Sequence, residues 1–179
     1  CVLPFTRMLG GPLDYTPGMF KMAIPGRPNN HVNTTLAKQL ALYVVIYSPI
    51  QMAADLIENY EGHPALQFIK DVPVDWETTQ VIEAKIGDFV TIARKDKNSE
   101  DWYLGAITDE NGRNAEFNLD FLESEKTYTA QIYKDADDAD YKTNPTAYKL
   151  EERQVKKGDQ LSIKLANGGG VAVRFKAVN

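Results

Sequence analysis

The chain has 179 residues, of which 43% are hydrophobic and 25% charged, and its formal net charge is -5. This balance is typical of soluble globular proteins and argues against a disordered chain or a membrane protein. The acidic charge disfavours nucleic acid as a partner, and no apolar run is long enough for a membrane-spanning helix. The lone cysteine, Cys1, excludes an internal disulfide framework and a multi-cysteine zinc site.

The first part of the chain predicts a strand, a long loop, a helix and a second strand. Residues 2–5 (VLPF) are a short apolar run, and residues 34–47 carry apolar side chains at helical spacing after an N-cap at Asn33 or Thr34. Residues 48–55 (SPIQMAAD) suit a buried parallel strand. This order is a βαβ unit, and one such unit cannot close a sheet or cover both of its faces.

The pattern changes near Trp76, after a short helical piece at residues 63–72. The later segments alternate apolar and polar residues, are rich in Val, Ile, Tyr, Phe and Thr, and are separated by turn signals. The strands expected from this pattern are residues 81–95, 101–109, 113–121, 126–135, 147–158, 159–166 and 169–178. Their spacing predicts an antiparallel β-sandwich.

Arg7, Asp14 and Asp55 are the candidate substrate-binding residues. Asp14 and Asp55 fall where an α/β barrel presents side chains, at the carboxyl ends of parallel strands, and Arg7 follows the first expected strand. The structural alternatives are a turn cap for Asp14, a helix cap for Asp55 and a salt bridge for Arg7. Because no Ser-His-Asp or Cys-His arrangement stands out, no catalytic residue is assigned.

Three further sets of residues allow both a functional and a structural interpretation. His31 and His63 have no partners at ligand spacing, so no metal site is assigned to them. Residues 135–140 (DADDAD) resemble a calcium loop but lack its Gly and closing Glu, which favours a solvated turn. Six aromatic residues could form a sugar-stacking platform, although side chains at strand spacing more often belong to a core. They are Trp76, Trp102, Tyr103, Tyr128, Tyr133 and Tyr148.

Residues 3–20, 36–76 and 87–113 together carry a family resemblance. The motifs LPFTRMLGGPLDYTPGMF, LAKQLALYVVIYSPIQMAADLIENYEGHPALQFIKDVPVDW and GDFVTIARK with DWYLGAITDENGR closely resemble the carboxy-terminal part of glycoside hydrolase family 97. This family comprises α-glucosidases and α-galactosidases of bacterial glycan-utilisation systems. The resemblance implies an α+β fragment. Residues 1–75 would be the last β/α units of a catalytic (β/α)8 TIM barrel, and residues 76–179 an accessory all-β antiparallel sandwich.

The resemblance also implies the function of a longer parent enzyme. That enzyme would hydrolyse α-glucosidic or α-galactosidic bonds of oligosaccharides with two carboxyl groups and a bound calcium ion. In the family, the catalytic carboxylates and the calcium ligands precede the stretch that matches LPFTR, so this fragment is expected to be inactive. Arg7, Asp14 and Asp55 would then form part of the active-site wall. The family suggests a periplasmic or secreted location. The alternative is a non-catalytic carbohydrate-binding or structural β-sandwich module.

A barrel remnant by itself raises a physical difficulty. The helix expected at residues 34–47 is apolar on nearly all sides in its second half, and a lone parallel strand has unpaired edges. Both would expose more apolar surface than soluble monomers usually do. We therefore expect repacking or disorder of residues 1–75, association with another copy, or a second chain that supplies the remainder of the barrel.

Overall fold

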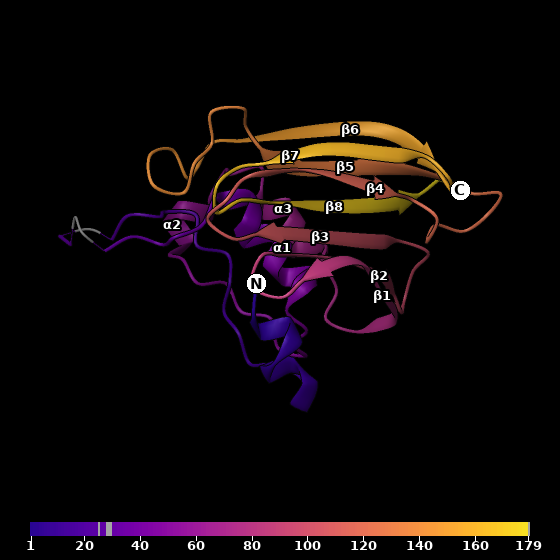
Figure 1. The fold of residues 1–179 in the computed structure, drawn as a ribbon, viewed down its shortest axis with the longest axis horizontal. Helices are drawn as coiled ribbons and strands as arrows, with labels where there is room; N and C mark the ends of the chain where they lie inside the picture. The colour runs from indigo at the N-terminus through magenta and orange to yellow at the C-terminus, as the bar shows by residue number, and fades with distance from the viewer. Residues whose placement is uncertain (25, 28–29, 179) are drawn as a thin grey trace.

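An antiparallel β-sandwich forms the second part of the chain in the computed structural model, which describes residues 1–24, 26–27 and 30–178 (Figure 1). The larger sheet has the strand order β1-β2-β3-β8-β5-β6, and β4 and β7 pair in a second sheet. The strands are β1 (Trp76–Lys85), β2 (Phe89–Asp96), β3 (Trp102–Thr108), β4 (Arg113–Asn118), β5 (Thr127–Asp135), β6 (Tyr148–Lys156), β7 (Gln160–Leu165) and β8 (Gly170–Ala177).

The small sheet covers one face of the large one because its strands alternate buried and exposed side chains. Along β7, Leu161, Ile163 and Leu165 are buried while their neighbours are exposed. They belong to the same core as Leu104 of β3 and Val173 of β8. The sandwich predicted from the alternating pattern is therefore confirmed.

The strand expected over residues 81–95 is wrong in one respect. Two strands, β1 and β2, occupy this stretch, and a turn separates them after Lys85. Gly87 lies in that turn with a φ of 87°, a conformation that a residue without a side chain adopts at little cost. The long apolar run thus folds back on itself as a hairpin.

Helix α1 (Leu36–Val45) packs on the opposite face of the large sheet, against β3 and β8. Its N-cap is Thr35, whose Oγ1 accepts the Lys38 N–H at 3.2 Å, so the expected cap at Asn33 or Thr34 is off by one or two positions. The approach to the sheet is close. A Cβ on Gly105 of β3 would lie 2.7 Å from the backbone oxygen of Ala41.

The strand expected at residues 2–5 is wrong. Leu3–Phe5 and Arg7–Gly10 are short 3-10 helices, and Pro4 has no N–H to give to a ladder. The parallel pairing lies further along the chain, where Tyr15 forms an isolated parallel bridge with Gln51. The Leu13 N–H donates to Tyr47 O and the Ala54 N–H donates to Pro17 O, both at 3.0 Å.

Residues 48–55 run beside residues 13–17 with bends at residues 49, 50 and 55, and they form this one bridge rather than a strand. A parallel strand is stabilised by neighbours on both sides, and here one neighbour is present. Ile50, in the bend before the bridge, is 66% exposed. The order of the two paired segments with α1 between them is still that of a βαβ crossover.

Two short helices complete the first part of the chain, α2 (Ile57–Tyr60) and α3 (Leu66–Asp71), the latter within the helical piece expected at residues 63–72. Phe68 of α3 packs edge-on against Tyr103 and Tyr133 of the large sheet. One hydrophobic core therefore runs from residues 1–75 into the sandwich. The boundary near residue 75 stays a prediction. Among the described residues, no helix is long and apolar enough to cross a membrane.

Candidate functional site

Asp55 lies at the end of the paired segment 47–54, at the corner where the chain turns into α2. Its Oδ2 accepts the N–H groups of Phe20 at 2.8 Å and Lys21 at 2.6 Å. Its Oδ1 accepts the Leu56 N–H at 2.8 Å and the Asn59 amide at 2.6 Å. Both oxygens are thus saturated by donors, and Asp55 joins the loop after residue 17 to the start of α2.

The pKa of Asp55 reflects these contacts. Partial burial works to raise it, but the donors from Lys21, Asn59, Leu56 and Phe20 favour the carboxylate and hold the pKa below its usual range. An ionised carboxylate with every lone pair engaged is a structural anchor and has no free oxygen for acid–base chemistry.

Two tyrosines fix the same corner from inside the core. The Tyr60 hydroxyl accepts the Asp55 N–H at 2.9 Å and donates to Gly18 O at 2.7 Å. The Tyr43 hydroxyl lies 3.1 Å from Pro17 O and 3.0 Å from Met52 O, and burial raises its pKa. Sequence reasoning assigned Tyr43 only to an apolar helix face. The feature of the sequence that indicated a polar contact is the Tyr43 hydroxyl, which needs a hydrogen-bond partner when the ring is buried.

A depression of about 480 Å³ opens beside Asp55. Apolar side chains make up most of its wall, beside the polar groups of Asp55, Glu58 and Asn59. Residues lining it include Met19, Lys21, Ile24, Leu56, Glu58 and Asn59.

The structure does not gather the three predicted site residues. Arg7 lies in a 3-10 helix and curls over its own loop, with Nη1 3.5 Å from Gly11 O and Nη2 3.3 Å from Pro12 O. Asp14 is exposed on the first paired segment. Within residues 1–24, 26–27 and 30–178, no hydrogen bond or ion pair joins Arg7, Asp14 and Asp55 to one another. The premise that Arg7 follows a parallel strand is wrong, because residues 2–5 are not a strand.

The aromatic residues are core residues. Trp102, Tyr103, Tyr128 and Tyr133 are at most 4% exposed. Trp76 is partly buried against Tyr103, at a centroid distance of 5.6 Å, and Tyr148 stacks on His63 at 5.5 Å. These rings do not form an exposed row, so the sugar-stacking platform expected of a carbohydrate-binding module is not formed by them.

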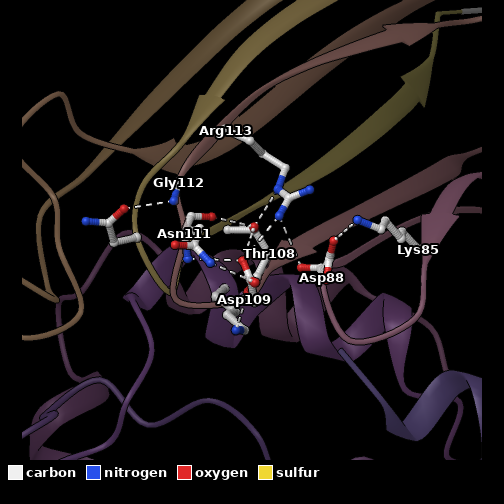
Figure 2. Close-up of polar contacts among 9 residues, drawn as sticks. Lys85, Asp88, Thr108, Asp109, Asn111, Gly112 and Arg113 are labelled. Atoms are coloured by element: carbon white, nitrogen blue, oxygen red, sulfur yellow. Dashed lines mark hydrogen bonds and ion pairs between the residues drawn. The ribbon is translucent and has the colours of Figure 1, made fainter.

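The turn between β3 and β4 holds a dense polar network (Figure 2). The Arg113 guanidinium donates to Thr108 Oγ1 at 2.6 Å and to Asp109 Oδ1 at 3.2 Å, and it covers the Phe89 ring at 4.4 Å. Asp109 also accepts the backbone and side-chain N–H groups of Asn111, both at 3.0 Å. Because these groups satisfy one another, residues 109–113 form a structural turn between β3 and β4.

Beside this turn, Lys38 lies in the first turn of α1, and Asp135 is the last residue of β5. Lys38 Nζ donates to Thr108 O at 2.6 Å, and burial lowers its pKa against the opposing effect of Asp109 and Asp135. Asp135 Oδ2 accepts the N–H groups of Ala166 and Gly170, each at 2.9 Å, while Oδ1 is buried without a partner. The solvated turn expected for residues 135–140 is wrong for Asp135, which is buried as the last residue of β5. The feature of the sequence that indicated its burial is the apolar strand directly before it.

The other candidates for metal ligation have structural contacts. His63 Nδ1 accepts the Ala65 N–H at 3.2 Å. In the acidic run, Asp137 pairs with Lys149 at 2.6 Å and Asp140 accepts the Lys142 N–H at 2.8 Å, as in a solvated turn. His31 bridges to Ala23. No group of three His, Cys, Asp or Glu residues in the described part of the chain is placed to hold a metal ion.

Comparisons with known proteins match both parts of the chain. The family described as "Glycosyl-hydrolase 97 C-terminal, oligomerisation" matches residues 75–176. The chain is 35% identical, over 98% of its length, to a retaining alpha-galactosidase of Bacteroides thetaiotaomicron and spans 27% of that protein. It is also 30% identical, over 95% of its length, to a probable retaining alpha-galactosidase of Streptomyces bingchenggensis, of which it spans 24%.

Solved structures agree with these relatives. A Glycoside Hydrolase Family 97 enzyme from Pseudoalteromonas sp. strain K8, in complex with panose, is 51% identical with a TM-score of 0.95. The match covers 99% of this chain and 28% of that one. A beta-arabinopyranosidase at 23% identity and a TM-score of 0.77 shares the fold. The chain therefore spans about a quarter of the length of the relatives that it matches.

Proposed function

The chain belongs to glycoside hydrolase family 97, and from this premise we propose that it is the carboxy-terminal part of an α-glycosidase whose catalytic carboxylates lie in other segments. The observation that carries the proposal is the match at 51% identity over 99% of the chain to an enzyme of which it spans only 28%. The family description places residues 75–176 at the carboxyl end of such enzymes. Most of the additional length then precedes this chain.

The substrate class follows from the relatives. Two of them are named as retaining or probable retaining alpha-galactosidases, and the Pseudoalteromonas enzyme was solved with panose and with acarbose. We propose that the parent protein hydrolyses α-galactosidic or α-glucosidic bonds of oligosaccharides. Its reaction would use a pair of carboxyl groups on either side of the scissile bond.

We propose further that residues 1–75 contribute the last β/α units of a (β/α)8 barrel. The parallel contacts between segments 13–17 and 47–54, with α1 between them, support this assignment. So does the distribution of exposed apolar side chains, which concentrates before Trp76. These are Val2, Leu3, Leu9, Ile24, Ile50, Met52, Leu56, Ile57 and Val74. In a complete barrel, neighbouring strands and helices would cover them.

In such a barrel the Asp55 corner would border the active site, because side chains at the carboxyl ends of the strands face the barrel mouth. The role proposed for Asp55 is to hold the backbone of Phe20 and Lys21 in place rather than to contact the reacting atoms. Asp14, which is exposed on the first paired segment, and Arg7, which precedes that segment, are further proposals for the active-site wall.

The calcium ion and the cellular location are also proposals that rest on the family. The described residues hold no cluster suited to a cation, so the ligands of a calcium ion would come from the rest of the parent protein. A periplasmic or secreted location would fit a protein that acts on external oligosaccharides.

Hydrolysis of p-nitrophenyl α-galactoside and p-nitrophenyl α-glucoside tests the proposal. The 179-residue chain, purified free of host enzymes, should hydrolyse neither, and the longer protein that contains it should hydrolyse at least one. Turnover by the 179-residue chain itself, or none by the longer protein on any α-glycoside, would overturn the proposed function.

A further inference from the structure

Two Asn-Gly turns of the sandwich contact each other. Asn111-Gly112 lies between β3 and β4, where Figure 2 labels both residues, and Asn167-Gly168 lies between β7 and β8. The Gly112 N–H donates to Asn167 Oδ1 at 2.8 Å. The Gly168 N–H donates to Asp109 O, also at 2.8 Å. The N–H groups of the two glycines therefore interlock the turns.

Both glycines occupy positions where a side chain does not fit. A Cβ on Gly112 would lie 2.9 Å from Leu165 O, at the end of β7. Gly168 has a φ of 64°, and a Cβ there would lie 2.7 Å from Tyr141 Cβ. Asparagine followed by glycine is also the pair most prone to deamidation, because glycine has no side chain that hinders the approach of its nitrogen to the asparagine amide. The fold thus retains two chemically labile pairs.

Deamidation requires the backbone nitrogen that follows the asparagine. This nitrogen forms a bond to the asparagine Cγ and passes its proton, through solvent, to the side-chain amide, which leaves as ammonia. Water then adds to the resulting succinimide ring and opens it to aspartate or isoaspartate. A glycine N–H that is held in a hydrogen bond must leave its acceptor before its nitrogen can react, so the acceptor slows the first step.

The two turns differ in how firmly this nitrogen is held. Gly168 is buried, and its acceptor is the backbone oxygen of Asp109. Asn111 and Gly112 are exposed, and the Gly112 acceptor is the exposed side chain of Asn167. A side chain can rotate away from its donor, whereas a backbone oxygen moves only with the chain. We therefore expect Asn111 to be the more reactive of the two asparagines.

We propose that Asn111 is a site of spontaneous deamidation and that the Asn167 side chain sets its rate by holding the Gly112 N–H. In the aspartate product, a carboxylate replaces the Asn111 amide that now donates to Asp109 Oδ2 at 3.0 Å. The two negative charges then repel each other, and Asp109 is also the partner of Arg113 at 3.2 Å. Deamidation of one exposed residue would thus loosen the polar network of the β3–β4 turn. The inference does not depend on the proposed hydrolytic activity.

Peptide mass spectrometry of the full-length protein, incubated folded in mildly alkaline buffer, measures the conversion at Asn111 and Asn167 in one sample. We expect Asn111 to convert first. Asn167→Ala removes the acceptor of the Gly112 N–H, and conversion at Asn111 should become about fivefold faster, the factor that corresponds to one hydrogen bond. In concentrated urea, where neither protein has this hydrogen bond, the original and the variant should convert at the same rate.

The matched control is Asp140→Ala, which removes the acceptor of the Asn167 amide, at 3.0 Å, and leaves the contact with Gly112 in place. It should keep the rate at Asn111 within about twofold of the original. Asn111→Asp carries the charge of the product and should lower the Tm by about 2–4 °C. Circular dichroism establishes that each variant is folded before incubation.

Three results would overturn the inference. In the first, Asn111 of the folded protein stays intact over the time in which the protein in urea converts. In the second, Asn167→Ala leaves the rate at Asn111 unchanged. In the third, Asp140→Ala accelerates the conversion as much as Asn167→Ala does, which would mean that general loosening of the neighbouring loop, and not the contact with Gly112, controls the reaction.

Discussion

The Arg94 guanidinium of β2 donates from Nε to the backbone oxygen of Val44, in the last turn of α1, at 2.7 Å. The same guanidinium donates from Nη1 to Thr79 Oγ1 of β1 at 2.7 Å, and it lies 5.6 Å from the Tyr47 ring centroid. Arg94 is 6% exposed, and burial lowers its pKa to about 10, which leaves it charged at neutral pH. A cation is thus held at the negative end of the helix dipole, where it joins residues 1–75 to the sandwich.

Replacing Arg94 should weaken the contact between residues 1–75 and the sandwich and so lower the free energy of unfolding. Arg94→Met keeps most of the buried stem but removes the donor to Val44 O, so we expect a loss of about 2–3 kcal/mol in the free energy of unfolding. Urea denaturation followed by circular dichroism measures the loss. Thr79→Val, which removes only the Nη1 acceptor, should cost about 1 kcal/mol or less. Equal losses for the two variants would contradict the assigned role of the Val44 contact.

Asp135 should make the stability depend on pH with an unusual sign. Burial raises its pKa from the model-compound value of 3.8, although the N–H groups of Ala166 and Gly170 and the charge of Lys38 oppose the rise. Between the unfolded and the folded pKa, the folded chain therefore binds more protons at this residue than the unfolded chain. The contribution of Asp135 to stability is highest below about pH 4 and falls as the pH rises through that window.

Asp135→Asn removes this titration and keeps an oxygen for the N–H groups of Ala166 and Gly170. We expect the variant to gain stability relative to the original protein as the pH rises from about 4 to 7, measured by urea unfolding at several pH values. Asp135→Ala, by contrast, should lose about 1–3 kcal/mol because two buried N–H groups lose their acceptor. Parallel pH profiles for the original protein and Asp135→Asn would refute the assignment.

The sequence pattern predicted the sandwich well because an antiparallel strand with one buried face has an alternating pattern within its own residues. In β7, the alternation of buried and exposed side chains marks both the strand and its inner face. Residues 2–5 have the composition of a strand, but a parallel strand is defined by its neighbours, and here Leu3–Phe5 form a 3-10 helix. Local composition could not distinguish these outcomes.

The Asp55 corner shows the same limit for the candidate site. A carboxylate at the end of an apolar segment was identifiable in the sequence, and so was its possible role as a cap. The donors that saturate Oδ2 belong to Phe20 and Lys21, which are 35 and 34 positions away. Which donors meet a carboxylate across such a separation depends on the tertiary fold, so the anchor role became visible only in the structure.

Asp55 should therefore matter more to the structure than the other two candidates. Asp55→Ala leaves the N–H groups of Phe20 and Lys21 without their acceptor, and we expect a loss of about 1–2 kcal/mol. Differential scanning calorimetry should show a lower Tm for this variant, whereas Arg7→Ala and Asp14→Ala should melt with the original protein. Because the folded pKa of Asp55 is depressed, its stabilising effect is present above about pH 4 and is lost on acidification below it. A Tm for Asp55→Ala that equals the original at neutral pH would contradict the anchor role.

Leu56 and Ile57 test whether the first part of the chain belongs to a larger barrel. They are 69% and 73% exposed, so Leu56→Ser and Ile57→Ser remove little buried apolar area from this chain. The 179-residue chain should unfold at the same urea concentration with or without these substitutions. In the longer protein, neighbouring barrel elements would cover both side chains, and each substitution should then cost about 1.5–3 kcal/mol. Val81→Ser is the matched control, because Val81 is 61% exposed but lies on β1 of the sandwich, away from the proposed barrel. If Leu56→Ser and Ile57→Ser affect the longer protein no more than Val81→Ser does, these side chains stay exposed there, and the barrel assignment of residues 1–75 loses its physical basis.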